Sequence, residues 1–174
     1  MQKINFFDAS NFVEAERNDT ISGLVDSRDG SMAYSTTEDR ESWVAEVENR
    51  SNKWFRFVPI DYNPAFDLRR ESGDMVSKCG GMIIYDNDRS LAFVELKDVR
   101  IGAAADAWAQ LESTIVLFHE NHDHRNFHRR FAYVANKRHP HFNYSHKTTS
   151  QEFYNRLHFR LLEQNRISLI QGAR

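Results

Sequence analysis

The sequence predicts a mixed α/β fold in a single domain, and three observations support this. The chain has 174 residues, of which 40% are hydrophobic and 13% aromatic, enough for one compact core and too few for two large ones. Short apolar runs of strand length alternate with longer stretches of helical periodicity. Their order (helix, strand, strand, strand, helix, strand, helix) is typical of α/β domains. We therefore expect one domain over residues 1–174.

The composition excludes several classes of protein. The formal net charge is -2 with 28% charged residues, so neither a polybasic tail nor a highly charged disordered chain is indicated. No run of 18 apolar residues occurs, and the first residues lack the pattern of a secretory signal. The single cysteine, Cys79, excludes a disulfide within the chain and a multi-cysteine zinc cluster. We expect a cytoplasmic protein with no membrane partner.

The first third of the chain is the least regular. Residues 1–36 are predicted to be loop-rich, because Gly23 and Gly30 interrupt any periodicity. From Thr37, a possible N-cap, the pattern predicts a helix whose apolar face carries Trp43, Val44 and Val47.

Strands and two further helices are predicted beyond this point. Residues 54–60 alternate as a strand, and residues 82–85 and 91–97 form a hairpin around a turn at 86–90. A helical stripe over 103–118 then precedes a strand at 131–135. A C-terminal helix is predicted over 150–163, with Ser150 as its cap.

The end of the predicted strand 91–97 carries the most informative chemistry. Strand periodicity places Glu95 and Lys97 on one face and turns Leu96 to the other. A carboxylate can bind a hard cation such as Mg²⁺, and a neighbouring amine can orient or help deprotonate an attacking water. An ordinary surface ion pair on a strand explains Glu95 and Lys97 equally well, so the surrounding sequence is needed to distinguish the two interpretations.

In its context, residues 79–97 followed by a helix containing Gln110 resemble the PD-(D/E)xK nuclease superfamily, also called restriction endonuclease-like. The resemblance covers about residues 40–135 and implies a mixed β-sheet flanked by helices. It also implies hydrolysis of phosphodiester bonds in DNA with Mg²⁺ or Mn²⁺ as cofactor, RNA being an alternative substrate.

The same resemblance assigns roles to individual residues. Glu95 would be a metal ligand, the Leu96 carbonyl a second ligand, Lys97 the water-activating group and Gln110 a positioning residue. An acid from an earlier helix is also expected, and Glu46 matches best, with Glu41 and Glu48 as alternatives.

The chain departs from the family pattern at the first acidic residue. If Asn87 and Asp88 form the centre of the hairpin turn, Glu95 lies opposite Gly80, or opposite Gly81 with a longer loop. Glycine has no side chain to bind a metal. Asp86 is excluded because it would lie at the turn, about 20 Å from Glu95.

Three explanations of the missing acid remain open. Asp74 can swing in from its loop, the site can be degenerate, or Gly80 can be a deliberate inactivating substitution. We therefore expect weak or absent cleavage. The alternative function is a nuclease-fold module without catalysis that binds nucleic acid or a protein partner.

A basic segment follows in the second half of the chain. No carboxylate occurs between His124 and Gln151, where aromatic residues are interleaved with six cations: Arg125, Arg129, Arg130, Lys137, Arg138 and Lys147. This pattern suits contact with phosphates and exposed bases, although a solvated face over an aromatic core explains it equally well. By analogy with enzymes that cut both strands of a duplex, we expect a homodimer.

Two other candidate sites compete with this interpretation. His119 and His122 can lie one helical turn apart and bind a transition metal, or simply stabilise the C-terminus of a helix. Cys79 is a possible nucleophile without an assignable partner, and a half-buried structural thiol is the simpler explanation.

Overall fold

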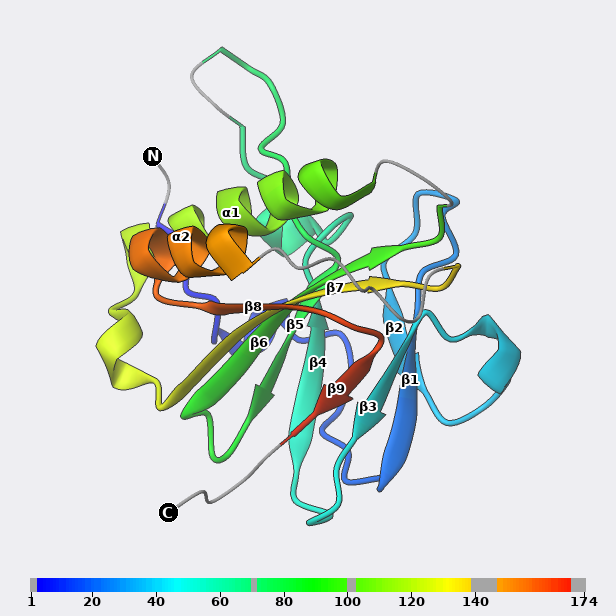
Figure 1. Cartoon of the computed structure of the whole chain (residues 1–174). Coiled ribbons are helices and arrows are strands. Elements are labelled where there is room, and N and C mark those ends of the chain that lie inside the picture. The colour runs from blue at the N-terminus through cyan, green and yellow to red at the C-terminus, as the bar shows by residue number, and fades with distance from the viewer. Residues whose placement is uncertain (1–2, 70–71, 100–102, 139–146, 170–174) are drawn as a thin grey trace.

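The computed structural model describes residues 3–69, 72–99, 103–138 and 147–169, which form two β-sheets and two α-helices (Figure 1). The helices are α1 (Ala103–Asn121) and α2 (Lys147–Leu157). The strands are β1 (Ile21–Val25), β2 (Tyr34–Thr36), β3 (Ala45–Glu48), β4 (Phe55–Pro59), β5 (Gly81–Tyr85), β6 (Ser90–Lys97), β7 (Arg129–Asn136), β8 (Arg160–Glu163) and β9 (Arg166–Ser168). Short 3-10 helices are η1 (Ala9–Asn11), η2 (Arg40–Ser42), η3 (Pro64–Phe66) and η4 (His124–Asn126).

The main sheet has the strand order β4-β5-β6-β7-β8. β4, β5 and β6 are antiparallel neighbours, whereas β6, β7 and β8 run parallel. The predicted mixed α/β class is therefore confirmed. The predicted hairpin is confirmed too, because Tyr85 pairs with Ser90 and Gly81 with Val94, which is the register that places position 80 opposite Glu95.

Each face of the main sheet packs against a different layer. Along β6, Leu91 and Phe93 pack with residues of both α-helices, while Ala92, Val94 and Leu96 belong to a second core on the other face. This alternation follows from the period of two in a strand. Figure 1 shows α1 and α2 lying together over one side of the sheet.

The second face is covered by the small sheet, whose order is β2-β1-β3-β9. Its Leu24, Val47 and Ile167 pack in the same core as Phe57 and Ile83 of the main sheet. The resemblance implied helices flanking the sheet, but in the described residues both α-helices lie on one face and a sheet covers the other. The restriction endonuclease-like assignment thus remains an expectation, while the α/β class is observed.

The helix predicted from Thr37 was wrong. Its residues form η2 and then β3, in which Ala45 and Val47 are buried while Glu46 and Glu48 are only half-buried. The period of two in this short segment is its strand signal, and pairing with β1 supplies the hydrogen bonds that a helix would have supplied internally. Tertiary pairing therefore overrides the local helical pattern.

The loop-rich prediction for residues 1–36 missed two strands. β1 and β2 form an antiparallel pair within this region. Gly23 interrupts the apolar pattern for a packing reason, since a Cβ there would lie 2.0 Å from the Trp43 ring. The glycine allows the indole to lie directly against the backbone of β1.

The predicted C-terminal helix is too long. α2 ends at Leu157, His158 adopts a left-handed φ of 59°, and β8 then follows with Leu161 buried. A non-glycine residue in the left-handed region ends a helix. Residues 160–163 are therefore a strand, paired in parallel with β7. Among the described helices, none is long and apolar enough to cross a membrane.

Candidate active site

The last residues of β6 extend beyond its neighbour β5. The β5–β6 pairing ends at Gly81 and Val94, whereas pairing with β7 continues to Lys97 and Asn136. Glu95 is 5% exposed, a rare degree of burial for a carboxylate. β6 thus carries a charged side chain almost entirely out of water at the end of the main sheet.

Lys97 connects this carboxylate to the first turns of α1. Its Nζ lies 3.1 Å from Oε1 of Glu95 and 3.0 Å from Oδ2 of Asp106, and it donates a hydrogen bond of 2.6 Å to Oε1 of Gln110. Gln110 in turn donates to the carbonyl of Lys78 at 3.4 Å. The fold therefore brings together Glu95, Lys97 and Gln110, the three side chains that the resemblance placed at one site.

Gly80 completes the group from the residue before β5. Its backbone N–H donates to Oε2 of Glu95 at 2.9 Å, which places residue 80 beside the carboxylate. Its carbonyl accepts from the Ile60 N–H at 3.1 Å, so the end of β4 also approaches this point. Both oxygens of Glu95 thus have a partner: Oε1 forms an ion pair with Lys97, and Oε2 accepts a hydrogen bond from a backbone amide.

The site shifts the proton affinity of both of its charged groups. Burial raises the pKa of Glu95 to about 7, although Lys97 and the Gly80 amide act to lower it. Burial acts to lower the pKa of Lys97, but Glu95 and Asp106 outweigh it, and the net shift is upward. Lys97 therefore stays charged, while Glu95 exchanges a proton near neutral pH, a property typical of functional carboxyls.

Asp61 is a second carboxylate near this group that the sequence did not single out. It follows Ile60, just after β4, and is half-buried. Burial raises its pKa, Lys78 and Lys97 act to lower it, and the charge of Asp61 in turn raises the pKa of Glu95. In the sequence it looks like a turn residue, and only the pairing of β4 with β5 brings it to the site.

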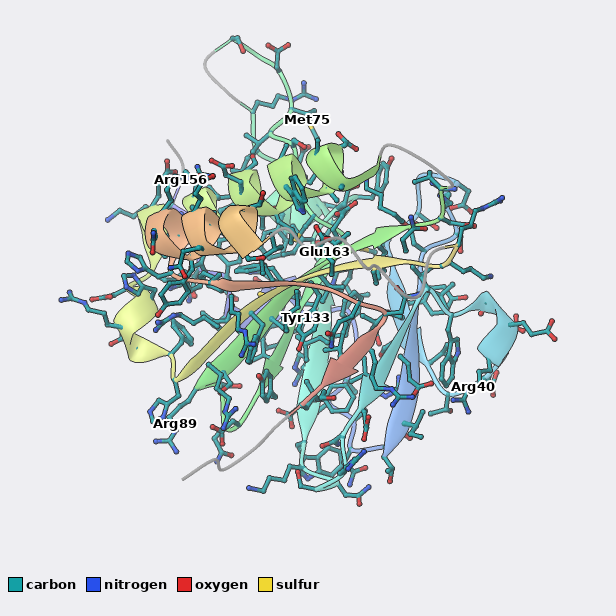
Figure 2. The ribbon with its side chains drawn as sticks, viewed as in Figure 1. Arg40, Met75, Arg89, Tyr133, Arg156 and Glu163 are labelled. Atoms are coloured by element: carbon teal, nitrogen blue, oxygen red, sulfur yellow. The ribbon has the colours of Figure 1, made fainter. Side chains whose placement is uncertain are left out.

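Two predicted acids lie elsewhere. Glu46 is on β3 in the small sheet, where it forms ion pairs with Arg40 and Arg166. Asp74 is exposed and accepts a hydrogen bond from Ser72. Its neighbour Met75 lies on a loop that projects beyond α1 (Figure 2). The structure therefore brings neither side chain into contact with Glu95.

The predicted basic surface is divided between the two ends of β7. Because β6 and β7 are parallel and Ser90 pairs with Arg129, the start of β7 lies at the end of the sheet remote from Glu95, about 25 Å from Lys137. Arg130 there donates to three backbone carbonyls, and Arg125 pairs with Asp123. These cations do not form one surface with the candidate site.

The other end of β7 does lie beside the site. The Lys137 N–H donates to the Lys97 carbonyl at 2.9 Å, and the Arg138 guanidinium pairs with Asp98 at 2.7 Å. Arg28, which the sequence did not indicate, donates to the Asp98 carbonyl at 2.8 Å. Lys147 begins α2, and its side chain lies outside the described part of the structure.

The histidine alternative is not supported by the geometry. Nε2 of His119 lies 2.7 Å from the Leu157 carbonyl, and Nε2 of His122 accepts the Phe6 N–H at 3.1 Å. Each ring thus already uses one nitrogen in the protein. Cys79 is fully buried, and burial raises the pKa of its thiol to about 12, which keeps it protonated and unreactive.

Within the described ranges, no group of three histidine, cysteine, aspartate or glutamate side chains is placed to hold a metal ion. A site at Glu95 would therefore offer at most one further carboxylate, such as Asp61, whose charge acts on Glu95. This fits Mg²⁺, which usually keeps several waters and binds through one or two carboxylates together with substrate phosphates. Comparison with known proteins gives no match to any family model, curated protein or solved structure.

Proposed function

We propose that this chain is a metal-dependent phosphodiester hydrolase that acts on DNA, with low activity because Gly80 provides no carboxylate. The observation that carries the proposal is the convergence of Glu95, Lys97 and Gln110 at the end of β6, with Nζ of Lys97 within 3.1 Å of the other two side chains. A strand-end carboxylate can hold the cation of a metal-assisted hydrolysis, and an amine beside it can orient the attacking water.

Glu95 would hold Mg²⁺ or Mn²⁺, with the Leu96 carbonyl as a further oxygen and Asp61 as the second negative charge. A bound divalent cation would polarise the phosphate and lower the pKa of a water molecule. Glu95 must lose its proton to serve as a ligand, which its pKa of about 7 allows at neutral pH.

Lys97 has partners that can retain it when the cation takes its place beside Glu95. Asp106 and Gln110 both contact Nζ from α1, at 3.0 and 2.6 Å. They hold the ammonium at the edge of the site, where it can orient a water or a phosphate oxygen. Gln110 therefore acts as a positioning residue through Lys97.

The DNA backbone would be bound beside the site by the cations at the exit of β6 and β7. Lys137 is exposed, while Arg28 and Arg138 both contact Asp98, the residue that follows β6. Phosphate contacts of this kind position a nucleic acid without reading its sequence.

One observation favours a second candidate function, a binding module without catalysis. Oε1 of Glu95 is neutralised by Lys97 and Oε2 accepts from Gly80, so the carboxylate is satisfied without any cation. A protein that had lost its chemistry would keep such an internal ion pair and could still bind nucleic acid or a protein partner.

A cleavage and binding experiment separates the two functions. Duplex DNA, single-stranded DNA and RNA are incubated with the full chain and Mg²⁺ or Mn²⁺, and binding is measured in parallel. We expect slow cation-dependent DNA cleavage that Glu95→Gln and Lys97→Met abolish and Asp61→Asn reduces. The control is Asp86→Asn, which neutralises a carboxylate in the turn at the other end of β6.

The outcomes are distinct. DNA binding without cleavage in either cation would establish the binding module instead. Cleavage that persists unchanged in Glu95→Gln would show that the reaction takes place elsewhere or comes from a contaminant.

A further inference from the structure

A surface hollow of about 610 Å³ lies at the end of α1 remote from Asp106 and Gln110. Figure 2 labels Arg156, one of its lining residues, which belongs to the last turn of α2. The hollow is formed where the C-terminal turns of both α-helices meet η4, and it is lined by His119, Asn121, His122, Asp123, His124, Arg156 and His158. The proposed hydrolase site contains none of these residues.

Three imidazole rings gather in this hollow from three separate segments. The rings of His124 and His158 are stacked, with centroids 4.3 Å apart and planes 6° apart. The His119 ring lies edge-on to His124 at 5.2 Å. His158 reaches this position because its left-handed backbone ends α2 and turns the chain back towards η4.

The hydrogen bonds of these rings leave nitrogens available. The Leu157 carbonyl can only accept, so Nε2 of His119 carries a proton and donates, which leaves Nδ1 for another partner. Among the described residues, His124 and His158 make ring contacts, and neither forms a hydrogen bond through a ring nitrogen. His122 instead accepts the Phe6 N–H, which keeps that ring neutral.

One guanidinium beside the hollow, that of Arg130, interacts with backbone carbonyls and not with a carboxylate of the described residues. The Arg130 guanidinium donates to the carbonyls of His124, Phe127 and His158 at 2.8–2.9 Å, and neutral carbonyls leave its charge uncompensated. Burial lowers the pKa of His124, and the charges of His158, Arg130 and His119 lower it further, while Asp123 opposes them.

The acidic groups near the hollow are already paired. Both oxygens of Asp123 accept from Arg125, at 2.7–3.0 Å. Glu112 forms an ion pair with Arg156, which lines the hollow from α2. Glu152 of α2 also raises the pKa of the Arg156 guanidinium, and the Tyr154 ring lies 6.3 Å from that of His158. Arg130 is thus the cation beside the hollow with which no carboxylate of the described residues pairs.

We propose that this hollow binds an oxyanion of the phosphate and sulfate class through His119, His124 and His158. The source of such an anion would be free phosphate or the terminal phosphate of a nucleic acid. A transition metal fits less well, because a metal lies in the plane of each ring that binds it, and the planes of His124 and His158 are nearly parallel.

Sulfate is the sharpest first probe, because its charge does not change between pH 6 and 8. We expect saturable binding to the full chain by calorimetry, about 25-fold or more tighter at pH 6 than at pH 8, as uptake of one imidazole proton would give. His124→Asn and His158→Asn should each weaken binding at pH 6 by about tenfold. Asparagine tolerates the left-handed backbone at position 158.

His128→Asn is the matched control, since His128 does not line the hollow, and circular dichroism checks the fold of each variant. Nuclear magnetic resonance of the histidine rings keeps the proposal testable even if one variant unfolds, because sulfate should shift the signals of His124 and His158 in the unmodified chain. Absence of saturable binding at pH 6, or equal binding by a folded His124→Asn or His158→Asn and the control, would overturn the proposal.

Competition identifies the source of the anion. Inorganic phosphate, an oligonucleotide with a 5′-phosphate and the same oligonucleotide without it are each added to the sulfate complex. If inorganic phosphate displaces sulfate and neither oligonucleotide does, the ligand is a free anion. If the oligonucleotide with the 5′-phosphate displaces sulfate and the one without it does not, the ligand is the end of a nucleic acid. Displacement by none of them contradicts the proposal. The Glu95→Gln variant should give the same results, so this test stands independently of the hydrolase.

Discussion

The Gly80 amide donates a hydrogen bond to Oε2 of Glu95 at 2.9 Å, so the residue opposite this carboxylate contacts it through the backbone alone. The other oxygen, Oε1, faces Lys97 at 3.1 Å. A carboxylate that is buried, paired with an amine and lacking an acidic partner from the next strand is stable without a cation. The chemistry of Glu95 therefore depends on the side chain at position 80, on pH and on the contacts that position Lys97.

Replacing Gly80 with aspartate should raise cation-dependent activity. A Cβ at position 80 would make ordinary contacts, 3.4 Å from the Val94 carbonyl and 3.7 Å from Cγ of Leu96. Gly80→Asp should therefore fold. Because the backbone of residue 80 contacts Glu95, the added negative charge should increase Mg²⁺ affinity and cleavage by about tenfold or more. Calorimetry with Mg²⁺ and a DNA cleavage assay measure the two effects.

Two variants control this experiment. Gly80→Asn has the same shape without the charge and should not gain activity. Gly81→Asp should destabilise the fold by several kcal/mol, because a Cβ there would lie 2.5 Å from the Phe57 ring. If Gly80→Asp folds and gains neither affinity nor cleavage, the site at Glu95 is not a latent metal site.

Folding stability should fall as the pH rises towards 7. The folded state raises the pKa of Glu95 from 4.5 to about 7, so between these values it holds a proton that the unfolded chain has released. The protonated Glu95 therefore contributes its full stabilisation below pH 4.5. As the pH rises through 7 this contribution is lost, and the free energy of unfolding falls by about 3 kcal/mol. Urea unfolding at pH 5 and pH 8 measures the difference.

Glu95→Gln should remove most of this dependence, because the amide cannot ionise. Glu38→Gln, at an exposed glutamate, is the matched control and should behave like the unmodified chain. A Glu95→Gln protein whose stability depends on pH as steeply as the original would show that other groups dominate.

Gln110→Leu should impair the positioning of Lys97. The substitution removes the 2.6 Å hydrogen bond to Nζ and leaves Asp106, an exposed side chain, as the remaining partner of Nζ on α1. If the proposed hydrolase is correct, kcat should fall by about tenfold with little change in KM. Gln151→Leu, at an exposed position of α2, is the control. A change confined to KM would instead indicate that Gln110 contacts the substrate.

The two ends of β7 should contribute unequally to nucleic-acid binding. Lys137→Ala and Arg138→Ala remove cations beside Lys97 and Asp98. Each substitution should reduce the slope of the logarithm of the DNA-binding constant against the logarithm of salt concentration by about one, because one phosphate is no longer neutralised. Arg125→Ala, at the remote end, should leave binding to the site unchanged. Filter binding over a series of salt concentrations measures this. A larger effect of Arg125→Ala would place the nucleic acid at the other end of the sheet.

Local patterns sufficed for the β5–β6 hairpin and for the centre of the candidate site. The apolar runs of β5 and β6 and the turn between them predict the register, and with it the position of Gly80 opposite Glu95. Alternation along β6 likewise places Glu95 and Lys97 on one face. These features depend on a strand period of two and a short hairpin, which are properties of neighbouring residues.

Long-range pairing decided the rest. The local patterns of β3 and β8 predict helix. These segments form strands because they pair with β1 and β7, which are distant in the sequence and therefore invisible to a local pattern. The proximity of Asp61 to Glu95, through which its charge raises the pKa of Glu95, depends on strand pairing in the same way. Two histidines that resemble a pair of metal ligands in the sequence form one side of a hollow that His158 completes.

By itself, then, the sequence determined the α/β class, the hairpin and the shared face of Glu95 and Lys97. The tertiary structure alone decided how strongly Glu95 is buried, that Asp61 lies near it, and that the basic segment is divided between two ends of one strand. The physical reason is that side-chain direction follows from local backbone geometry, whereas desolvation and the meeting of charges depend on which distant segments pack together.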